Sequence, residues 1–300
     1  MIYVETPLTD RMRRAVRDAW GRDACGPAER LFGGEESAAY RIGDLVVRVG
    51  PAWRGDAEIE WCHAVAARAA GGLPEAVAPL RTAAGGTIVR VDGRPLSLWP
   101  RVAGGWPDED RPDVRVQGAE LLARLHRALA GYRPPPRPVR SFAEIGLYGD
   151  ATAEPALADP DLDRWLAAFH RDASARQVVH GDYYAGNTLA RDGRLVAVLD
   201  WDEAFVAAPE FEVASAALEW TDEAGTPDAA AARRRFVADY HRAGGTAGPM
   251  DDVTLNQLIR HRLRREAAYF DLAAGRGVRH DEDDVAYHKR RVELFYSLRP

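Results

Sequence analysis

The sequence predicts an α+β protein in which a small lobe, an antiparallel sheet with helices, precedes a larger and mostly helical lobe. Short β-branched segments separated by glycine turns fill much of the chain before residue 102. From residue 113 onward, apolar residues instead recur at helical spacing over long segments. The 300 residues, 46% of them hydrophobic, suffice for one large or two ordinary domains. We therefore place the first lobe at residues 1–102 and the second at residues 105–300.

The first lobe is expected to combine helices with a sheet. Helical spacing places one helix at residues 7–20 and another at residues 55–70. Apolar and β-branched runs predict strands at residues 31–32, 38–42, 45–49, 77–80, 87–91 and 95–98. Glycine-containing turns at residues 33–37 and 43–44 separate the first three strands.

The second lobe is expected to be built mostly from helices. Their predicted ranges are 113–130, 160–173, 210–221, 229–243, 253–274 and 283–297. His126 lies beside the apolar face of the first of these helices, where a core or interfacial histidine is the expected reading. Residues 133–138, Arg-Pro-Pro-Pro-Arg-Pro, predict a stiff connector in polyproline II form.

A hairpin in the second lobe ends in two polar residues. Residues 187–190 and 195–199 read as strands, and Asp192-Gly193 between them is a turn signal. Because a hairpin brings its two ends together, Asn187 and Asp200 should face each other. Two oxygen ligands from paired strand ends suit a hard cation such as Mg²⁺.

The segment before this hairpin carries a further carboxylate. Residues 180–187 read His-Gly-Asp-Tyr-Tyr-Ala-Gly-Asn and follow a short strand at residues 177–179. Phosphoryl transfer from a nucleotide needs a carboxylate that orients or deprotonates the attacking hydroxyl, and oxygen ligands for Mg²⁺. Asp182, Asn187 and Asp200 form such a set.

These residues resemble a known family. The pattern H-G-D-x-x-x-x-N at residues 180–187, followed by L-D-W-D at residues 199–202, is similar to the aminoglycoside phosphotransferase and choline-kinase-like branch of the protein-kinase fold. Protein kinases have H-R-D and D-F-G at the corresponding places. Gly181 and Trp201 therefore favour small-molecule kinases over protein kinases.

The resemblance implies a two-lobed protein-kinase-like fold and an ATP-dependent transfer of phosphate to the hydroxyl group of a small molecule. It implies that Asp182 is the catalytic base or orienting group and that Asn187 and Asp200 bind Mg²⁺. His180 is expected to brace the loop by hydrogen bonds. The family reads the nucleotide base through the backbone, so GTP stays open as donor.

The resemblance also suggests nucleotide contacts in the first lobe. Gly33 and Gly34, with Ser37, could bring backbone amides to the phosphates, although any tight hairpin would use the same residues. Residues 99–104 resemble the hinge of the family, where the main chains of Pro100 and Val102 are candidate contacts for the base. A plain linker would explain the same residues.

Arg48 stands where the family has a lysine that contacts the phosphates and pairs with a glutamate of the next helix. Lys289 is the only lysine in the chain, so no other lysine can take this place. A guanidinium can bind phosphate, which keeps the role open to Arg48. Glu58 is the first choice for its partner and Glu60 the second, the alternative being a solvated helix charge.

The acceptor is expected to be a small-molecule alcohol, and a cationic one such as an aminoglycoside or another amine-bearing antibiotic or metabolite is the first candidate. The reason is a stretch between Arg194 and Arg233 that has carboxylates but no basic side chain. Its acids are Asp200, Asp202, Glu203, Glu210, Glu212, Glu219, Asp222, Glu223 and Asp228. Metal binding and helix starts would also explain several of them.

Two other functions stay open. The arginine at residue 48 leaves room for a nucleotide-binding pseudokinase with a regulatory role. A protein kinase is disfavoured, because no activation segment bounded by D-F-G and A-P-E follows Asp200.

The composition narrows the class of protein further. A net charge of −6 argues against a nucleic-acid partner, which normally leaves a basic footprint. No apolar run reaches the roughly 20 residues of a membrane helix, and the start of the chain lacks a secretory pattern, so we expect a cytoplasmic protein without a membrane partner. Cys25 and Cys62 have neither metal-ligand spacing nor a C-x-x-C pattern. The sequence gives no indication of the oligomeric state.

Overall fold

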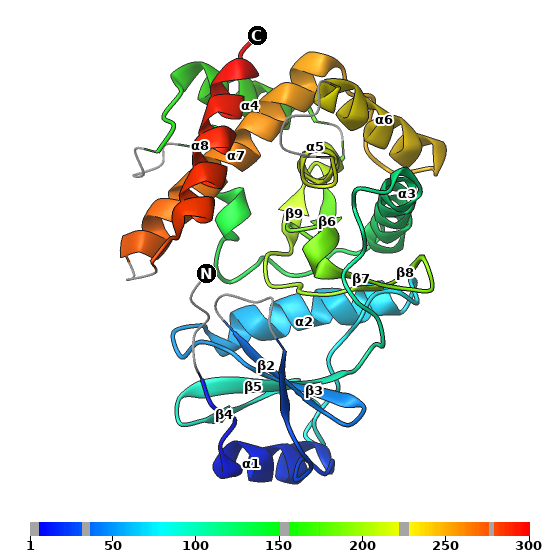
Figure 1. Cartoon of the computed structure of the whole chain (residues 1–300), viewed down its shortest axis with the longest axis vertical. Coiled ribbons are helices and arrows are strands. Elements are labelled where there is room, and N and C mark those ends of the chain that lie inside the picture. Colours follow the sequence, from blue (N-terminus) through cyan, green and yellow to red (C-terminus); the bar gives the residue numbers. More distant parts are fainter. Residues whose placement is uncertain (1–5, 32–36, 151–155, 174, 222–227, 276–278) are drawn as a thin grey trace.

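A computed structural model describes the chain except residues 1–5, 32–36, 151–155, 174, 222–227 and 276–278. A sheet lobe and a larger helical lobe lie one above the other (Figure 1). The α+β fold class predicted from the sequence is therefore confirmed.

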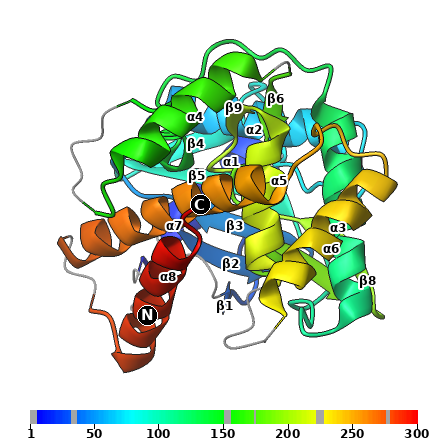
Figure 2. The ribbon, with the colours of Figure 1, turned by 90° about the horizontal axis from the view of Figure 1, so that it is seen from above.

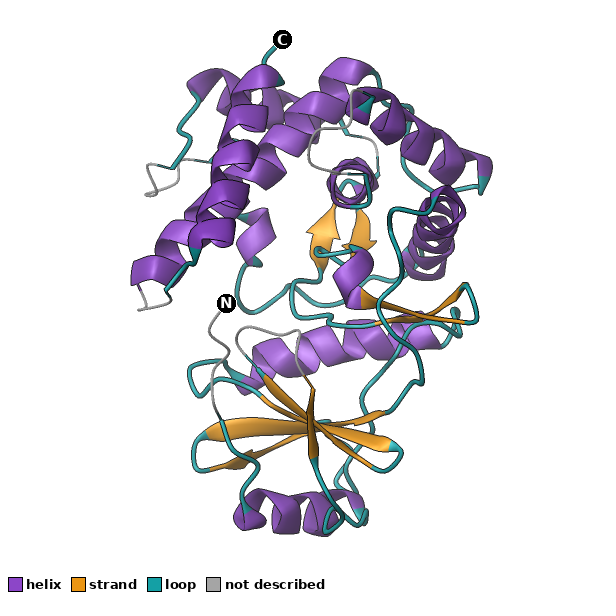
Figure 3. Cartoon of the chain, viewed as in Figure 1, coloured by secondary structure: helices purple, strands orange, loops and turns teal. Residues whose placement is uncertain are grey.

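The sheet of the small lobe has the strand order β1-β2-β3-β5-β4, and neighbouring strands are antiparallel (Figure 3). Its strands are β1 Glu29–Leu31, β2 Ala38–Ile42, β3 Leu45–Val49, β4 Ile88–Val91 and β5 Arg94–Pro100. Helix α1, Asp10–Trp20, buries Met12, Val16 and Trp20 against this sheet. Thr9 caps the helix, since its Oγ1 accepts a hydrogen bond from the Met12 amide at 3.3 Å.

The strand predicted at residues 77–80 does not form, so this prediction was wrong. The two ends of the segment bond in different places: the Val77 amide donates to Val198 at 3.1 Å, and the Leu80 amide donates to Leu98 at 2.7 Å. Pro79 between them has no N–H to donate. The segment therefore connects the sheet to the helical lobe and does not extend the sheet.

Helix α2, Asp56–Ala70, lies between the sheet and the helical lobe (Figure 1). Its buried residues Cys62 and Val65 belong to the same apolar cluster as Trp99 of β5 and Leu122 of the helical lobe, whereas α1 and most of the sheet form a separate cluster. Burial of apolar surface therefore joins α2 to the helical lobe. The lobe boundary drawn near residue 102 stays a prediction.

The helical lobe is arranged around α5, which is almost entirely buried. Figure 2 shows α5 near the centre, with α3 and α6 on one side and α7 on the other. The helices are α3 Pro112–Leu129, α4 Pro160–Asp172, α5 Pro209–Glu219, α6 Ala229–Arg242, α7 Asp252–Gly275 and α8 Glu282–Ser297. Proline is the first residue of α3, α4 and α5, where its missing N–H and fixed φ do no harm.

Short strands and single helical turns complete this lobe. Strand β7, Thr188–Arg191, pairs with β8, Arg194–Val198, and β6, Gln177–Val179, pairs with β9, Phe205–Ala207. Single turns of 3-10 helix lie at η1, Phe142–Glu144, and η2, Ala185–Asn187. The sequence reading missed β9, because a three-residue strand is too short to show periodicity.

None of the helices in the described ranges is long and apolar enough to cross a bilayer. The predicted cytoplasmic location stays a prediction.

Gly118 tests the packing between α3 and α5. A Cβ atom at this position would lie 2.9 Å from the ring of Trp220, which is fully buried beside α5. We expect Gly118→Ala to lower the free energy of unfolding by about 1–3 kcal/mol, because the buried ring cannot move aside. Chemical denaturation measures this change. Gly131→Ala is the control, since no atom lies within 4 Å of its Cβ; equal effects of the two substitutions would contradict the packing argument.

Candidate active site

The loop of residues 180–187 is fixed by the ring of His180, which is completely buried. The Asp182 amide donates to its Nδ1 at 3.4 Å, and its Nε2 donates to the Leu199 carbonyl at 2.8 Å. The two bonds assign the ring proton to Nε2. The ring thus ties the loop to the end of β8, and the expected bracing by hydrogen bonds is confirmed.

The predicted hairpin forms and brings the polar residues together. Thr188 lies opposite Val198 in the β7–β8 ladder, and the Leu199 amide donates to the Asn187 carbonyl at 2.8 Å. Asn187 is therefore next to Asp200. The Asp200 backbone has a positive φ of 54°, a strained conformation for a residue with a side chain.

Asn187 also reaches Asp182. Its Nδ2 donates to the Asp182 side-chain Oδ2 and to the Asp182 carbonyl, both at 2.9 Å. Because the amide nitrogen is used here, the Asn187 Oδ1 remains as an acceptor or metal ligand. The structure thus gathers Asp182, Asn187 and Asp200 at one edge of the hairpin.

The oxygen atoms of Asn187 and Asp200 suit a hard cation by their chemistry. In the part of the chain that the structure describes, no group of three or more His, Cys, Asp or Glu side chains is placed to hold a metal ion. A cation at this edge would therefore take further oxygen ligands from the phosphates of a nucleotide or from water.

Glu212, near the start of α5, fixes the loop of residues 180–187, and the sequence analysis did not predict this. It accepts hydrogen bonds from the Gly181 amide at 2.5 Å, the His180 amide at 2.9 Å and the His126 Nε2 at 2.8 Å. Burial acts to raise the pKa of Glu212, but the hydrogen bond and charge of His126 outweigh burial and leave this pKa below its usual value. Glu212 is only 1% exposed, so it does not contribute to an acidic surface as expected.

His126 was expected to be a core or interfacial histidine, and this is confirmed. Its ring is completely buried, and its Nδ1 bonds to the Tyr240 hydroxyl at 2.7 Å. The ring therefore links α3 to α6 and, through Glu212, to the catalytic loop.

Arg48 on β3 reaches across to the segment that follows β8. Its Nη2 bonds to the Asp202 Oδ2 at 2.6 Å and to the Asp200 Oδ1 at 3.2 Å. Arg54 makes a second ion pair with the Asp202 carboxylate. Burial acts to raise the pKa of Asp202, but the charges of Arg48 and Arg54 hold it at about 2. Asp202 is therefore an ionised link between the two lobes.

The predicted pairing of Arg48 with Glu58 does not form, so it was wrong. The Glu58 Oε1 instead accepts from the Arg54 Nη2 at 3.1 Å and the Arg137 Nη2 at 3.2 Å. Arg54 lies four residues before Glu58, in the turn that leads into α2, and so reaches this carboxylate in the first turn of the helix. The Arg48 guanidinium pairs with Asp202 and Asp200 instead.

Glu60, the second choice, has another role. It accepts from the Thr87 amide and the Thr87 hydroxyl, both at 2.7 Å, and so fixes the start of β4.

Arg137 was not expected at the site. It belongs to the proline-rich connector, and its Nη2 donates to the Asp202 carbonyl at 2.8 Å. The Arg54 Nη2 donates to the same carbonyl at 2.7 Å. Residues 133–138 thus do more than connect two helices, because Arg137 returns from the helical lobe to α2 and to the segment after β8.

Residues 99–104, predicted to form the hinge, leave some backbone groups without a hydrogen bond in the described part of the chain. The Arg101 amide donates to the Asp44 carbonyl at 2.8 Å, and Leu45 lies opposite Pro100. Leu45 and Pro100 are therefore a pair without mutual hydrogen bonds, and the Pro100 carbonyl points away from β3. The backbone of Val102 makes no hydrogen bond among the described residues.

Beyond Val102 the hinge pairs with β7. The Gly105 amide donates to the Ala190 carbonyl at 3.0 Å, and the Ala190 amide returns a bond at 2.7 Å. A Cβ at residue 104 would lie 2.8 Å from that Ala190 carbonyl, so the close approach requires Gly104.

Ser37, at the start of β2, is buried and lines a cavity of about 20 Å³ with Arg48 and Asp202. It therefore lies near the ion pairs described above. Gly33 and Gly34, predicted to form the phosphate loop with it, lie outside the described residues.

Asp182 has a second partner that the sequence reading missed. The Arg262 Nη2, from α7, donates to its Oδ1 at 3.0 Å. The Arg262 Nε donates to the Glu266 Oε1 at 2.9 Å and lies 3.4 Å from the Glu219 Oε1. The sequence could not single out Arg262, because five of the six residues 260–265 are Arg or His.

The acidic stretch between Arg194 and Arg233 does not form an open acidic surface in its described part. Most of its carboxylates have partners within the molecule. Examples are Glu203 with Ser141, Glu210 with the Gly248 amide, Glu219 with Arg291 and Asp228 with Arg235. Asp222 and Glu223 lie outside the described residues.

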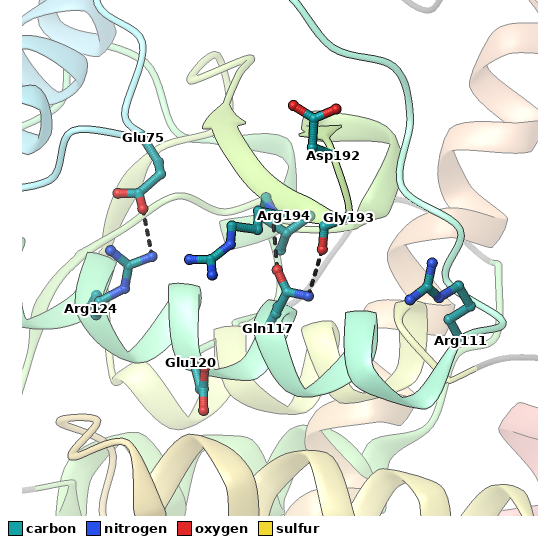
Figure 4. Close-up of a pocket in the computed structure, with 9 residues that line it drawn as sticks. Glu75, Arg111, Gln117, Glu120, Arg124, Asp192, Gly193 and Arg194 are labelled. Carbon is teal, nitrogen blue, oxygen red and sulfur yellow. Dashed lines mark hydrogen bonds and ion pairs between the residues drawn. The ribbon is translucent and has the colours of Figure 1, made fainter.

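A larger cavity, about 620 Å³, lies between α3 and the β7–β8 hairpin (Figure 4). Gln117 spans it from α3, donating to the Gly193 carbonyl at 3.0 Å, and Arg124 pairs with Glu75 at 2.8 Å. Its lining residues do not include Asp182, Asn187 or Asp200. This cavity is therefore separate from the candidate active site.

Solved structures of small-molecule kinases share this architecture. An amicoumacin kinase in complex with AMP-PNP, Ca²⁺ and Ami has a TM-score of 0.72, with 13% identity over 96% of this chain and 93% of that chain. A microcompartment-associated aminopropanol kinase has a TM-score of 0.65, with 16% identity over 95% and 94% of the two chains. These likenesses confirm the two-lobed protein-kinase-like fold.

The chain belongs to the Phosphotransferase enzyme family, whose model matches residues 28–248. This match confirms the family resemblance inferred from residues 180–187. It also confirms, at the level of the family, the prediction that the protein is a phosphotransferase.

Two curated relatives are similar to part of the chain. A homoserine kinase of Pseudomonas aeruginosa is 30% identical over 190 residues, which cover 59% of this chain and 58% of the relative. A homoserine kinase of Methylobacillus glycogenes is 28% identical over 171 residues, covering 54% and 53%. The chain spans just over half the length of these relatives.

Glu212→Gln tests the support of the catalytic loop. An amide has one acceptor oxygen, so its NH₂ group would face a backbone N–H, and we expect a loss of about 1–3 kcal/mol in the free energy of unfolding. Denaturant titration measures this loss. Glu120→Gln, at an exposed position of α3, is the matched control. If both variants unfold alike, Glu212 does not hold the loop.

Proposed function

We propose that this chain is an ATP-dependent, Mg²⁺-requiring kinase that phosphorylates a hydroxyl group of a small, amine-bearing molecule. One observation carries the proposal: Asp182, Asn187 and Asp200 converge at one edge of the β7–β8 hairpin, in a chain that belongs to a phosphotransferase family. Such a set supplies what phosphoryl transfer requires of a protein.

Asp182 acts on the acceptor. Its carboxylate orients the acceptor hydroxyl and takes the proton, while the hydroxyl oxygen forms a bond to the γ-phosphorus. The bond from that phosphorus to the bridging oxygen breaks, and ADP leaves with the electron pair. Hydrogen bonds from Asn187 and Arg262 fix the carboxylate, so positioning supplies much of the rate.

Asn187 and Asp200 would hold Mg²⁺ through the Asn187 Oδ1 and the Asp200 carboxylate. When bound, the cation neutralises charge on the phosphates. Arg48 faces the same edge from β3, where it can pass from the carboxylates to the phosphates, because a guanidinium binds either group.

The other nucleotide contacts that we propose lie in the sheet lobe and the segment that follows it. The Pro100 carbonyl and the Val102 amide would bind the base, and Ser37 lies on the phosphate side near Arg48. Contacts through backbone leave ATP and GTP both open as donors. Glu58 acts indirectly, by holding Arg54 and Arg137 against Asp202. A kinase that uses ATP in this way would work in the cytoplasm.

The acceptor class draws support from the relatives. Homoserine, which the names of the two homoserine kinases give, is an amine-bearing alcohol. The internal partners of the described acidic residues speak against an acceptor that depends on many positive charges, such as an aminoglycoside.

Asp182→Asn tests the proposed chemistry. The amide cannot take the hydroxyl proton, so we expect turnover to fall about a hundredfold or more while ATP affinity stays within about threefold. ADP release with a panel of hydroxy amino acids, amino alcohols, nucleosides and aminoglycosides measures turnover, and calorimetry measures ATP binding.

If Asp182→Asn transfers phosphate at the wild-type rate, Asp182 is not the catalytic group. If the unaltered protein binds ATP with Mg²⁺ but transfers phosphate to no acceptor, the chain is the nucleotide-binding pseudokinase that the arginine at residue 48 left open.

Arg48 is the second test. Arg48→Ala removes a charge-assisted hydrogen bond to the phosphates, so we expect ATP affinity to fall about tenfold or more, and Arg48→Lys to retain part of it. Calorimetry with a non-hydrolysable ATP analogue and Mg²⁺ measures the affinity. Arg41→Ala on β2, which removes a surface ion pair with Glu29, is the control. Equal affinities in Arg48→Ala and the control would remove Arg48 from the nucleotide site.

A further inference from the structure

Arg262 offers unused hydrogen-bond donors beside the candidate catalytic carboxylate. Its Nη2 donates to the Asp182 Oδ1 at 3.0 Å, and its Nε donates to the Glu266 Oε1 at 2.9 Å. Its Nη1 makes no hydrogen bond among the described residues. The side chain of Arg262 is 17% exposed and that of Asp182 is 29% exposed, so both reach solvent.

Two glutamates fix the guanidinium of Arg262 at its Nε atom. Glu219 and Glu266 lie along its Nε edge, and both also bond the Arg291 Nη2, at 2.5 and 2.6 Å. The glutamates thus hold Arg262 with its other edge toward Asp182. The N–H groups of Nη1 and the second N–H of Nη2 remain, and one N–H from each of these two nitrogens can bind a carboxylate or phosphate with two parallel hydrogen bonds.

The charges near Asp182 favour an acceptor with an anionic group. A cationic group that approaches Asp182 meets the Arg262 guanidinium. Glu219 and Glu266, the other carboxylates in contact with Arg262, are already shared with Arg291. An anionic group on the acceptor, in contrast, finds the open Nη1 donors.

We propose that Arg262 binds a carboxylate of the acceptor while Asp182 receives its hydroxyl, so that the acceptor is a small hydroxy amino acid. This inference rests on the proposed kinase function and narrows its substrate class. The γ-phosphoryl group could supply the same anionic oxygens, and the experiment below separates the two sources.

The test uses pairs of acceptors that differ only by a carboxylate. Homoserine and 3-aminopropan-1-ol, serine and ethanolamine, and threonine and 1-aminopropan-2-ol are such pairs. Steady-state kinetics with the full chain, ATP and Mg²⁺ gives kcat and KM for each, and an aminoglycoside is assayed beside them. We expect the unaltered protein to prefer the carboxylate member of at least one pair.

Arg262→Gln should then remove the preference. Losing a charge-assisted pair of hydrogen bonds predicts a fall in kcat/KM of about 100-fold for the carboxylate acceptor, mostly through KM. The decarboxylated partner should keep its KM within about threefold, because it never used these hydrogen bonds. Arg262→Lys keeps a charge without the fork and should fall between the two.

Arg264→Gln is the matched control. Arg264 lies two residues further along α7, away from the face of Arg262, and pairs with Asp163 at 2.6 Å. The Arg264→Gln substitution can lower stability, which thermal unfolding measures. It should leave the ratio of kcat/KM between paired acceptors unchanged.

Several results would overturn the inference. An equal fall in kcat/KM for both members of a pair in Arg262→Gln, without a separate rise in KM for the carboxylate member, would leave Arg262 with the phosphoryl group or the position of Asp182 alone. Phosphorylation of decarboxylated acceptors or of the aminoglycoside alone would reject the carboxylate and leave the kinase function standing. Transfer to no acceptor, with ATP bound, would reject the kinase function and this inference together.

Discussion

The carboxylate of Asp202 joins parts of the molecule that lie far apart in the sequence. Arg48 comes from the sheet, Arg54 from the start of α2, and Arg137 reaches the carbonyl of the same residue from the connector. Each arginine is largely buried, and a buried charge is tolerated only when it is paired and hydrogen-bonded. The geometry around Asp200 depends on this cluster, because Asp200 and Asp202 share Arg48.

The sequence predicted the parts of the site that depend on neighbours along the chain. The Asp192-Gly193 turn predicted that the two ends of the hairpin meet, but an irregularity between Leu189 and Ala190 shifts the register by one residue and brings Asn187 to Leu199, which the turn did not reveal. The general order of strands and helices was also predictable, because it depends on patterns among residues that are close in the sequence. The strand expected at residues 77–80 failed, because an apolar run does not reveal where its backbone amides find partners.

Contacts between distant residues could not be predicted in this way. Several carboxylates could have paired with Arg48. Sequence spacing alone could not predict that its partner is Asp202 and not Glu58. Glu212 looked like a surface acid at a helix start, yet α5 turned out to be buried at the centre of the lobe. Arg137 and Arg262 were hidden for the same reason, because long side chains pair according to the fold and not according to sequence distance.

The shared apolar cluster of α2 and the helical lobe limits how the two halves can move. Cys62 and Val65 are fully buried in that cluster, and the backbone bond from Val77 to Val198 lies a few residues beyond the same helix. Any opening that keeps this core intact must leave α2 in place with the helical lobe. The sheet is tied to this helix as well, because Trp99 of β5 belongs to the same cluster and Glu60 of α2 bonds Thr87 at the start of β4. A movement of the two lobes against each other must therefore break part of this shared core.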